Sequence, residues 1–279
     1  MNKKIFGYDF NFTFNGICEN LIDELRFYPD IIEKNNNFKK VNVEFTFKDN
    51  TEALSSNPSL IGVCNKGFYQ NLGYAKLFWD LSELNNNTIG VKIIVPKSET
   101  SVFKRSIRRF LSMGYEVFPE NIGQVMHELV FVPTTFFFQD KVIIHGSCLH
   151  NKNFNSTVIF GGTGGVGKTS SLLELGKDNN WIFLSDDIVV IDENGVIYPN
   201  YAYPKIYAYN TLDDKELERS IQNEKSLTSN LQWKLKKKRN PASVIRRVGP
   251  NLLYKTEYAE LPLKTNLFLF RGKYDGDIT

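Results

Sequence analysis

Short segments in which apolar and polar residues alternate predict β-strands in the first part of the chain. The alternation is clearest in three places, Val41–Phe47, Gly90–Val95 and Tyr115–Phe118. Asparagine clusters at Asn35–Asn37 and Asn85–Asn87 interrupt the alternation and predict turns. One segment, Ser101–Leu111, instead spaces its apolar residues as a helix does, which predicts a surface helix with solvated basic residues.

Closely spaced apolar segments follow in the middle of the chain. Lys141–Cys148 and Thr157–Phe160 read as strands separated by the polar turn Asn151–Asn155. Strands joined so closely must pair antiparallel. A turn centred near residue 153 gives a register in which His145 lies roughly opposite Phe160, the residue directly before a run of glycines.

That run contains the phosphate-binding pattern G-x-x-x-x-G-K-[ST], with a strand before it and a short predicted helix, Ser170–Gly176, after it. The candidate nucleotide-binding residues are Gly162, Thr163, Gly164, Gly165, Val166, Gly167, Lys168, Thr169 and Ser170. Glycines let backbone N–H groups turn towards phosphate oxygens, and the helix N-terminus adds partial positive charge. Lys168 can reach the β- and γ-phosphates, and the Thr169 hydroxyl can bind Mg²⁺. The alternative is a glycine-rich turn with an incidental lysine, but strand, loop and helix occur in the required order, so we expect ATP and Mg²⁺ as cofactors.

Two adjacent carboxylates follow the next predicted strand, Trp181–Ser185, and precede another, Ile188–Ile191. Adjacent side chains on an extended chain point in opposite directions, so Asp186 and Asp187 are expected to have different roles. One can bind a metal ion while the other accepts a proton from an attacking hydroxyl; the alternative is a solvated acidic turn. His145 is a third candidate, because the hairpin register sets its ring beside the glycine loop, although a lone strand histidine is commonly structural.

Together, His145-Gly146-Ser147, the glycine loop and Ser185-Asp186-Asp187 resemble the HPr kinase/phosphorylase catalytic domain, which is related in fold to phosphoenolpyruvate carboxykinase. The resemblance covers about residues 127–210. It implies an α/β fold with α+β character, built on a P-loop-containing mixed sheet with a smaller N-terminal region. It also implies an enzyme, a kinase that transfers the γ-phosphoryl group of ATP to a serine or another hydroxyl.

By this resemblance, Asp186 is the general base, while Lys168 and Thr169 bind phosphate and metal. Asp187 is a metal-site carboxylate, and His145 orients the base or binds the metal. The glycine-rich segment by which bacterial enzymes recognise HPr is not found. The expected acceptor is therefore a serine of another protein or peptide, or a small hydroxyl compound.

Two regions are expected, an N-terminal α+β region over residues 1–120, a candidate for substrate recognition, and a nucleotide-binding catalytic domain over residues 121–279. In the last third, strands and a turn are expected in Gly195–Tyr209, a polar helix in Asp213–Asn223 and a core strand in Leu261–Phe270. The basic segment Trp233–Arg239 is interpreted as solvated and mobile. The alternative is contact with phosphate or an acidic substrate, with Arg246 and Arg247 as the residues to test first.

The composition and charge of the chain limit the classes of partner and of site that we expect. The chain has 279 residues, 42% hydrophobic and 23% charged, with 34 basic against 31 acidic residues, which is globular and nearly neutral. We therefore expect no nucleic-acid and no membrane partner. The cysteines, Cys18, Cys64 and Cys148, have no C-x-x-C spacing, so neither a disulfide framework nor a zinc site is expected. The acidic residue Asp9 occurs before any apolar segment that could form the core of a signal peptide, so we expect a cytoplasmic protein.

Two alternatives to a kinase stay open at this stage. One is a catalytically inactive ATP-binding regulatory module, and the other is a carboxykinase acting on oxaloacetate, for which the chain is short. A homo-oligomer also stays open, as does the identity of the phosphate acceptor.

Overall fold

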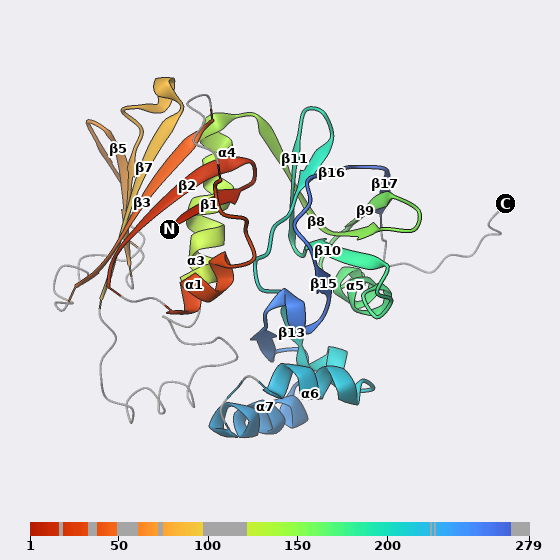
Figure 1. Cartoon of the computed structure of the whole chain (residues 1–279). Helices are drawn as coiled ribbons and strands as arrows, with labels where there is room; N and C mark the ends of the chain where they lie inside the picture. Colours follow the sequence, from red (N-terminus) through yellow and green to blue (C-terminus); the bar gives the residue numbers. More distant parts are fainter. Residues whose placement is uncertain are drawn as a thin grey trace.

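The computed structural model describes residues 1–16, 19–32, 38–48, 61–71, 75–96, 122–223, 225 and 227–268. Within these residues the chain is mixed α/β, with two large mixed sheets and few helices (Figure 1). The helix predicted at Ser101–Leu111, the strand predicted at Tyr115–Phe118 and the turn predicted at Asn35–Asn37 lie outside them. No described helix is both long enough and apolar enough to cross a membrane.

The N-terminal part forms a seven-stranded sheet in the order β1-β2-β3-β7-β6-β5-β4. Its strands are β1 (Asn2–Ile5), β2 (Tyr8–Asn15), β3 (Lys40–Lys48), β4 (Ile61–Cys64), β5 (Gly67–Asn71), β6 (Lys76–Asp80) and β7 (Thr88–Pro96). Strand β3 pairs parallel with both β2 and β7. The other neighbouring strands of this sheet pair antiparallel. The strands predicted around residues 41–47 and 90–95 are thereby confirmed, as is the turn at residues 85–87, where Asn87 adopts a left-handed backbone.

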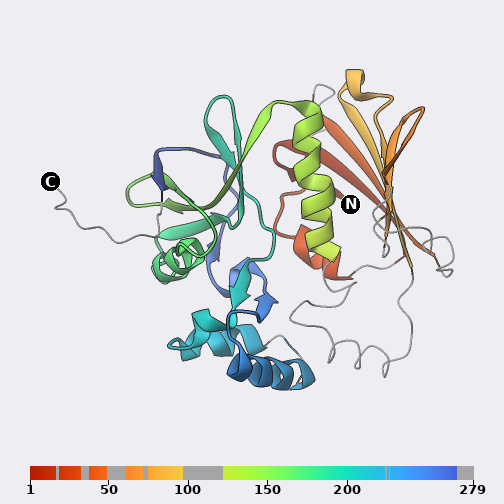
Figure 2. The ribbon, with the colours of Figure 1, turned by 180° about the vertical axis from the view of Figure 1, so that it is seen from behind.

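One continuous helical stretch covers one face of this sheet (Figure 2). It consists of α3 (Ile122–Met126), the π-helical segment His127–Phe131 and α4 (Val132–Phe138), and the short helix α1 (Glu19–Leu25) contacts α3. Edge-to-face contact joins Phe131 to Phe10 of β2, with ring centroids 5.1 Å apart. Residues 122–138 therefore share a core with the N-terminal sheet, while the division expected after residue 120 stays a prediction.

The second large sheet is organised around a long strand, β8. Its strands are β8 (Lys141–Asn151), β9 (Ser156–Gly161), β10 (Trp181–Ser185), β11 (Ile188–Asp192), β12 (Val196–Tyr198), β15 (Lys255–Thr256), β16 (Leu261–Pro262) and β17 (Thr265–Phe268). Strand β9 pairs with β8 along one edge, and β10 then β11 pair with it along the other, all antiparallel. Because β9 and β10 are both antiparallel to β8, they run parallel to each other. They end at the same edge of the three-stranded part β9-β8-β10, beyond which β8 continues with β11 as partner.

Most elements predicted in this region are confirmed, but one helix and one strand differ from the prediction. The helix after the glycine run, α5 (Lys168–Leu175), begins two residues before the predicted start at Ser170. The single core strand predicted at Leu261–Phe270 is wrong, because the described part of that segment divides into β16 and β17, which pair with different strands. Leu267 is 44% exposed, so β17 lies at the margin of the sheet rather than in its core.

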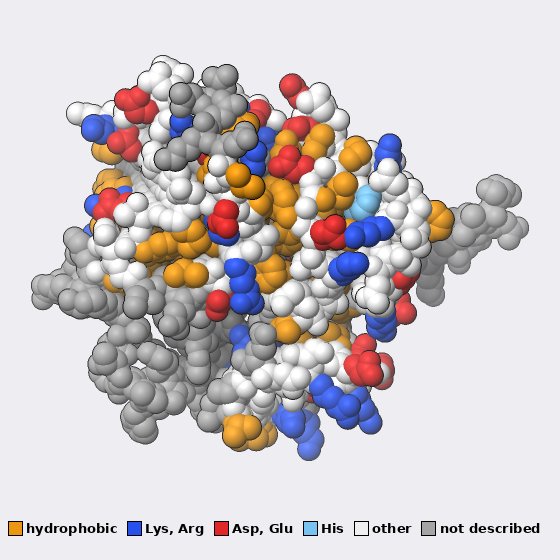
Figure 3. Space-filling view, in the orientation of Figure 1, with side chains coloured by type: hydrophobic (Ala, Val, Ile, Leu, Met, Phe, Trp, Pro, Cys, Tyr) orange, Lys and Arg blue, Asp and Glu red, His pale blue; other side chains and the backbone are white. Residues whose placement is uncertain are grey.

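A small C-terminal unit packs below the second sheet in the view of Figure 1. It contains the paired strands β13 (Lys205–Tyr207) and β14 (Ile245–Arg247) and the helices α6 (Lys215–Asn223) and α7 (Leu227–Arg239), with 3₁₀ turns at Ala208–Thr211 and Pro250–Leu252. The polar helix predicted at residues 213–223 is confirmed as α6. The basic segment predicted to be mobile is instead the last half of α7, where Trp233 is buried under the guanidinium of Arg246. Basic side chains lie along the lower edge of the surface over this unit (Figure 3).

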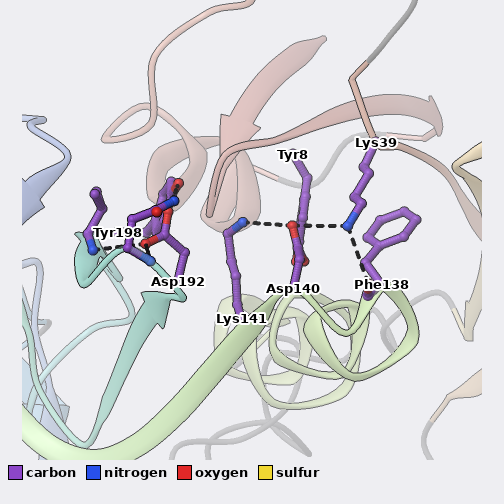
Figure 4. A network of polar contacts seen from close by, with 9 residues as sticks. Tyr8, Lys39, Phe138, Asp140, Lys141, Asp192 and Tyr198 are labelled. Carbon is purple, nitrogen blue, oxygen red and sulfur yellow. Dashed lines mark hydrogen bonds and ion pairs between the residues drawn. The ribbon is translucent and has the colours of Figure 1, made fainter.

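A polar network joins the N-terminal sheet to the start of β8 (Figure 4). The Tyr8 hydroxyl donates to Asp140, whose carboxylate also pairs with Lys39 and Lys141 at 3.0 and 3.1 Å. The Lys141 ammonium lies 4.5 Å from the ring centroids of both Tyr8 and Tyr198. These contacts fix the entry of the chain into the strand that carries the candidate site.

Candidate phosphate-binding and carboxylate site

The loop between β9 and α5 has backbone conformations that favour glycine. Gly165 and Gly167 have φ angles of 77° and 105°, which residues with a Cβ rarely adopt. A Cβ placed on Gly164, Gly165 or Gly167 would meet no other atom within 4 Å. Backbone conformation thus requires glycine at positions 165 and 167, and the space beside Gly164, Gly165 and Gly167 is open.

The side chain of Lys168 is hydrogen-bonded to the backbone of this loop. Its ammonium donates to the carbonyls of Gly162 and Thr163, at 2.8 and 3.0 Å, and the residue is only 8% exposed. Among the described residues no side chain caps the N-terminus of α5, so the first N–H groups of this helix have no side-chain partner there. Backbone donors, helix dipole and ammonium together favour an anion in the loop.

The two adjacent carboxylates connect β10 to β11 at the point where β8 exchanges one partner for the other. Ser185 pairs with Cys148 and Ile188 pairs with His145, so the acidic pair lies beside residues 146 and 147 of β8. Asp187 has a left-handed φ of 69°, and its carbonyl accepts from the Gly146 N–H at 3.1 Å. This turn holds the Asp186–Asp187 corner against β8.

Asp186 is the buried member of the pair, at 4% exposure. Its Oδ1 accepts from the Ser147 hydroxyl at 2.7 Å and from the Asp187 N–H at 3.1 Å. Its Oδ2 is buried and has no hydrogen-bond partner among the described residues. Burial first, and the neighbouring charge of Asp187 second, raise the pKa of Asp186 to about 6, against the opposing hydrogen bonds. A carboxylate with this pKa can accept a proton near neutral pH if a bound substrate reaches its unpartnered oxygen, which is buried in the free protein.

His145 lies at the same corner, but the register predicted for it is wrong. Gly146 pairs with Gly161 and Ser147 pairs with Phe160, two residues later than expected, because β8 continues to Asn151 before the chain turns. The exposed His145 ring instead places Nδ1 3.0 Å from the carbonyl of Asp187. Ser147 is the β8 residue whose side chain contacts Asp186, and no role was predicted for it from the sequence. Its signal in the sequence is its place two residues after His145, on the same side of the strand.

The phosphate-binding loop and the aspartate corner lie at one edge of the sheet. Strands β9 and β10 flank β8 and end in the same direction, and strands separated by one neighbour are roughly 10 Å apart. A triphosphate seated in the loop would therefore extend within reach of the aspartate corner. The sequence predicted this meeting from the order of the motifs.

The side chains at this edge fit a hard divalent cation held jointly with phosphate. Among the described residues no three His, Cys, Asp or Glu side chains gather as a metal cluster. Magnesium bound with a nucleotide usually takes only one or two carboxylates, with phosphate oxygens and waters completing its shell. The Thr169 hydroxyl and the Asp187 carboxylate are oxygen donors of this kind. The Asp187 carboxylate is paired with Lys205 at 3.0 Å.

Of the two arginines considered as possible phosphate contacts, Arg246 is committed to the core of the C-terminal unit. Arg246 is 4% exposed and donates to the Ile221 carbonyl, the Asn230 amide oxygen and both oxygens of Ser229. These bonds hold α6, α7 and β14 together and contradict the phosphate-contact interpretation of Arg246. Arg247 donates to the Tyr203 carbonyl at 3.0 Å.

The other two histidines are buried. His127 packs against Phe131, and burial above all lowers its pKa to about 3. His150 lies within β8, with Nδ1 3.0 Å from the Thr157 hydroxyl. Both side chains therefore pack inside the fold.

A groove of about 680 Å³ lies apart from this edge, on the N-terminal sheet. Its polar lining includes Asn11, Thr13, Asn42, Glu44 and Lys92, which alternate along β2, β3 and β7 with residues buried beneath the helical layer. The groove lies within residues 1–120, the region considered for substrate recognition, and its lining includes none of the candidate nucleotide-binding or catalytic residues.

No protein-family model matches the chain, and no curated protein matches it significantly. The functional conclusion therefore depends on the chemistry of the site.

Proposed function

We propose that the protein is an ATP-dependent kinase of the HPr kinase-like type, which transfers the γ-phosphoryl group to a hydroxyl of a protein, a peptide or a small molecule. The observation that carries this proposal is the meeting of two features at one sheet edge. One is a glycine loop closed by Lys168, and the other is Asp186, a buried carboxylate with one unpartnered oxygen.

The loop supplies the binding of the nucleotide. In the free protein Lys168 bonds to two loop carbonyls, and with nucleotide present the same ammonium turns to phosphate oxygens. The uncapped N–H groups at the start of α5 donate to the phosphates beside it. Thr169 and Asp187 would hold Mg²⁺, which when bound screens the charge of the transferred group.

Asp186 supplies the proton acceptor. As the acceptor oxygen forms its bond to the γ-phosphorus, the bond between that phosphorus and the β–γ bridging oxygen breaks and ADP leaves. The proton of the acceptor hydroxyl passes to Oδ2 of Asp186, while Ser147 and the Asp187 N–H keep Oδ1 in place. The pKa of about 6 leaves this carboxylate ionised, yet basic enough, near neutral pH.

His145 supports the corner rather than the proton transfer. The Nδ1–H tautomer donates to the Asp187 carbonyl and leaves Nε2 as an acceptor on an exposed ring. This contact favours the orienting role among the two that the family resemblance implies for His145.

The test is incubation with labelled ATP, Mg²⁺ and a panel of proteins, peptides and small hydroxyl compounds, with Lys168→Ala beside the wild type. The proposal predicts a labelled acceptor with the wild type and none with Lys168→Ala. Labelled acceptor that persists undiminished in Lys168→Ala would remove the loop from the reaction.

A nucleotide-binding regulatory module is separated from a kinase by Asp186→Asn. The kinase proposal predicts that this variant keeps its affinity for ATP and loses phosphoryl transfer. Wild-type ATP binding without transfer to any acceptor would favour the regulatory module. Release of carbon dioxide from oxaloacetate in the presence of ATP would favour a carboxykinase.

A further inference from the structure

Lys205 is a basic side chain held at the aspartate corner. Its ammonium lies 3.0 Å from Oδ2 of Asp187, and the two side chains are 34% and 39% exposed. Its backbone is fixed in β13, opposite Arg247 of β14, and the next residue, Ile206, is fully buried. The stem of Lys205 is therefore anchored, while its charged end lies partly in solvent.

The corner itself is fixed by backbone contacts that do not involve Lys205. The Asp187 carbonyl accepts from the Gly146 N–H and lies 3.0 Å from Nδ1 of His145. Exchange of the Asp187–Lys205 ion pair therefore requires only side-chain rotation. Partly exposed ion pairs of this kind contribute little to stability, so exchange costs little free energy.

A phosphoryl-transfer site needs more positive charge than Lys168 alone supplies. The triphosphate is a polyanion, and Asp186 and Asp187 add negative charge beside it. With Arg246 committed to the core, Lys205 is a cation that the fold brings to the corner, since its ammonium pairs with Asp187.

We propose that Lys205 binds the terminal phosphoryl group, remaining on Asp187 in the free protein and moving to phosphoryl oxygens when ATP binds. This inference rests on the proposed function. It assigns to Lys205 the role that the sequence had suggested for the arginines, and it makes Lys205 a determinant of the preference for ATP over ADP. An ammonium reaches a single phosphoryl oxygen as a point charge and needs no bidentate geometry.

The test compares ATP and ADP dissociation constants, with Mg²⁺ present, for the wild type, Lys205→Met and Lys205→Arg. Loss of a charged hydrogen bond to the terminal phosphoryl group predicts about tenfold weaker ATP binding for Lys205→Met. ADP binding should change by less than about threefold, and Lys205→Arg should keep most of the preference for ATP. The control is Lys177→Met, which removes an exposed ion-paired lysine beyond the end of α5 and should leave both constants unchanged.

A second comparison separates phosphate contact from mere support of Asp187. If Lys205 contacts the phosphoryl group, Lys205→Met should still weaken ATP binding in the Asp187→Asn background. Disappearance of the effect in that background, or an unchanged ATP-to-ADP ratio in Lys205→Met, overturns the inference. If Lys168→Ala weakens ATP binding in the same experiment, only the role of Lys205 fails; if Lys168→Ala binds ATP as the wild type does, the proposed function fails with it.

Discussion

The buried carboxylate of Asp186 makes the stability of the free protein depend on pH in a direction opposite to that of most acidic groups. Its pKa is about 6 in the folded protein against an ordinary value of 3.8, so folding favours the protonated form. Stability from this group is complete below pH 3.8 and is lost as the pH rises through 6. A rise of about two pKa units corresponds to about 3 kcal/mol of unfolding free energy above pH 7.

Asp186→Asn removes this cost because the amide does not ionise. Its oxygen can accept the Ser147 and Asp187 hydrogen bonds, while its NH₂ group takes the buried position of Oδ2. A buried NH₂ without a partner is itself unfavourable by about 1–3 kcal/mol, so the absolute gain at one pH is not diagnostic. The diagnostic quantity is the difference in unfolding free energy between variant and wild type as the pH changes.

Denaturant unfolding without metal or nucleotide should show this difference increasing in favour of Asp186→Asn by about 1.5 kcal/mol between pH 5 and pH 8. The matched control, Asp213→Asn, alters an exposed carboxylate and should differ from the wild type by less than about 0.5 kcal/mol throughout. A difference that stays constant with pH, or that decreases, would refute the raised pKa and with it the proton-accepting role of Asp186.

Three further changes have expected outcomes. Ser147→Ala removes a hydrogen bond that lowers the pKa of Asp186. The acidic limb of the pH profile of kcat should therefore move to higher pH by about one unit, and a limb that does not move would contradict the contact. Arg246→Met should lower the unfolding free energy by about 3 kcal/mol or more while the folded variant keeps its ATP affinity, because the guanidinium serves the core; weakened ATP binding would return it to the site. Gly167→Ala meets no atom but forces a φ of 105° on alanine, so ATP affinity and melting temperature should both fall, and an unaffected variant would show that the loop tolerates a Cβ.

The parts of the site that could be predicted from the sequence are those governed by local rules. A glycine loop between an apolar strand and a helix requires backbone conformations that few other sequences favour, so its residues could be named in advance. The adjacent aspartates could likewise be placed at the end of a strand, because alternation identifies β10 and β11 on either side of them.

The parts that could not be predicted depend on contacts distant in the sequence. The register of the β8–β9 hairpin depends on the length of its turn. A small error in the predicted turn therefore placed His145 opposite Phe160, where the structure has Ser147. The burial of Arg246 depends on α6, α7 and Trp233 closing around it, which a run of basic residues does not reveal. Lys205 reaches Asp187 only because β13 pairs with β14, and neither strand carries a motif.

The central claim is that the glycine loop and the aspartate corner surround one triphosphate. The most direct measurement is a crystal structure of the protein with Mg²⁺ and a non-hydrolysable ATP analogue. The prediction is that the triphosphate lies in the loop over Lys168, and that the metal ion is bound by the Thr169 hydroxyl and the Asp187 carboxylate at about 2.1 Å. A nucleotide bound elsewhere, or a metal ion out of reach of both aspartates, would contradict it.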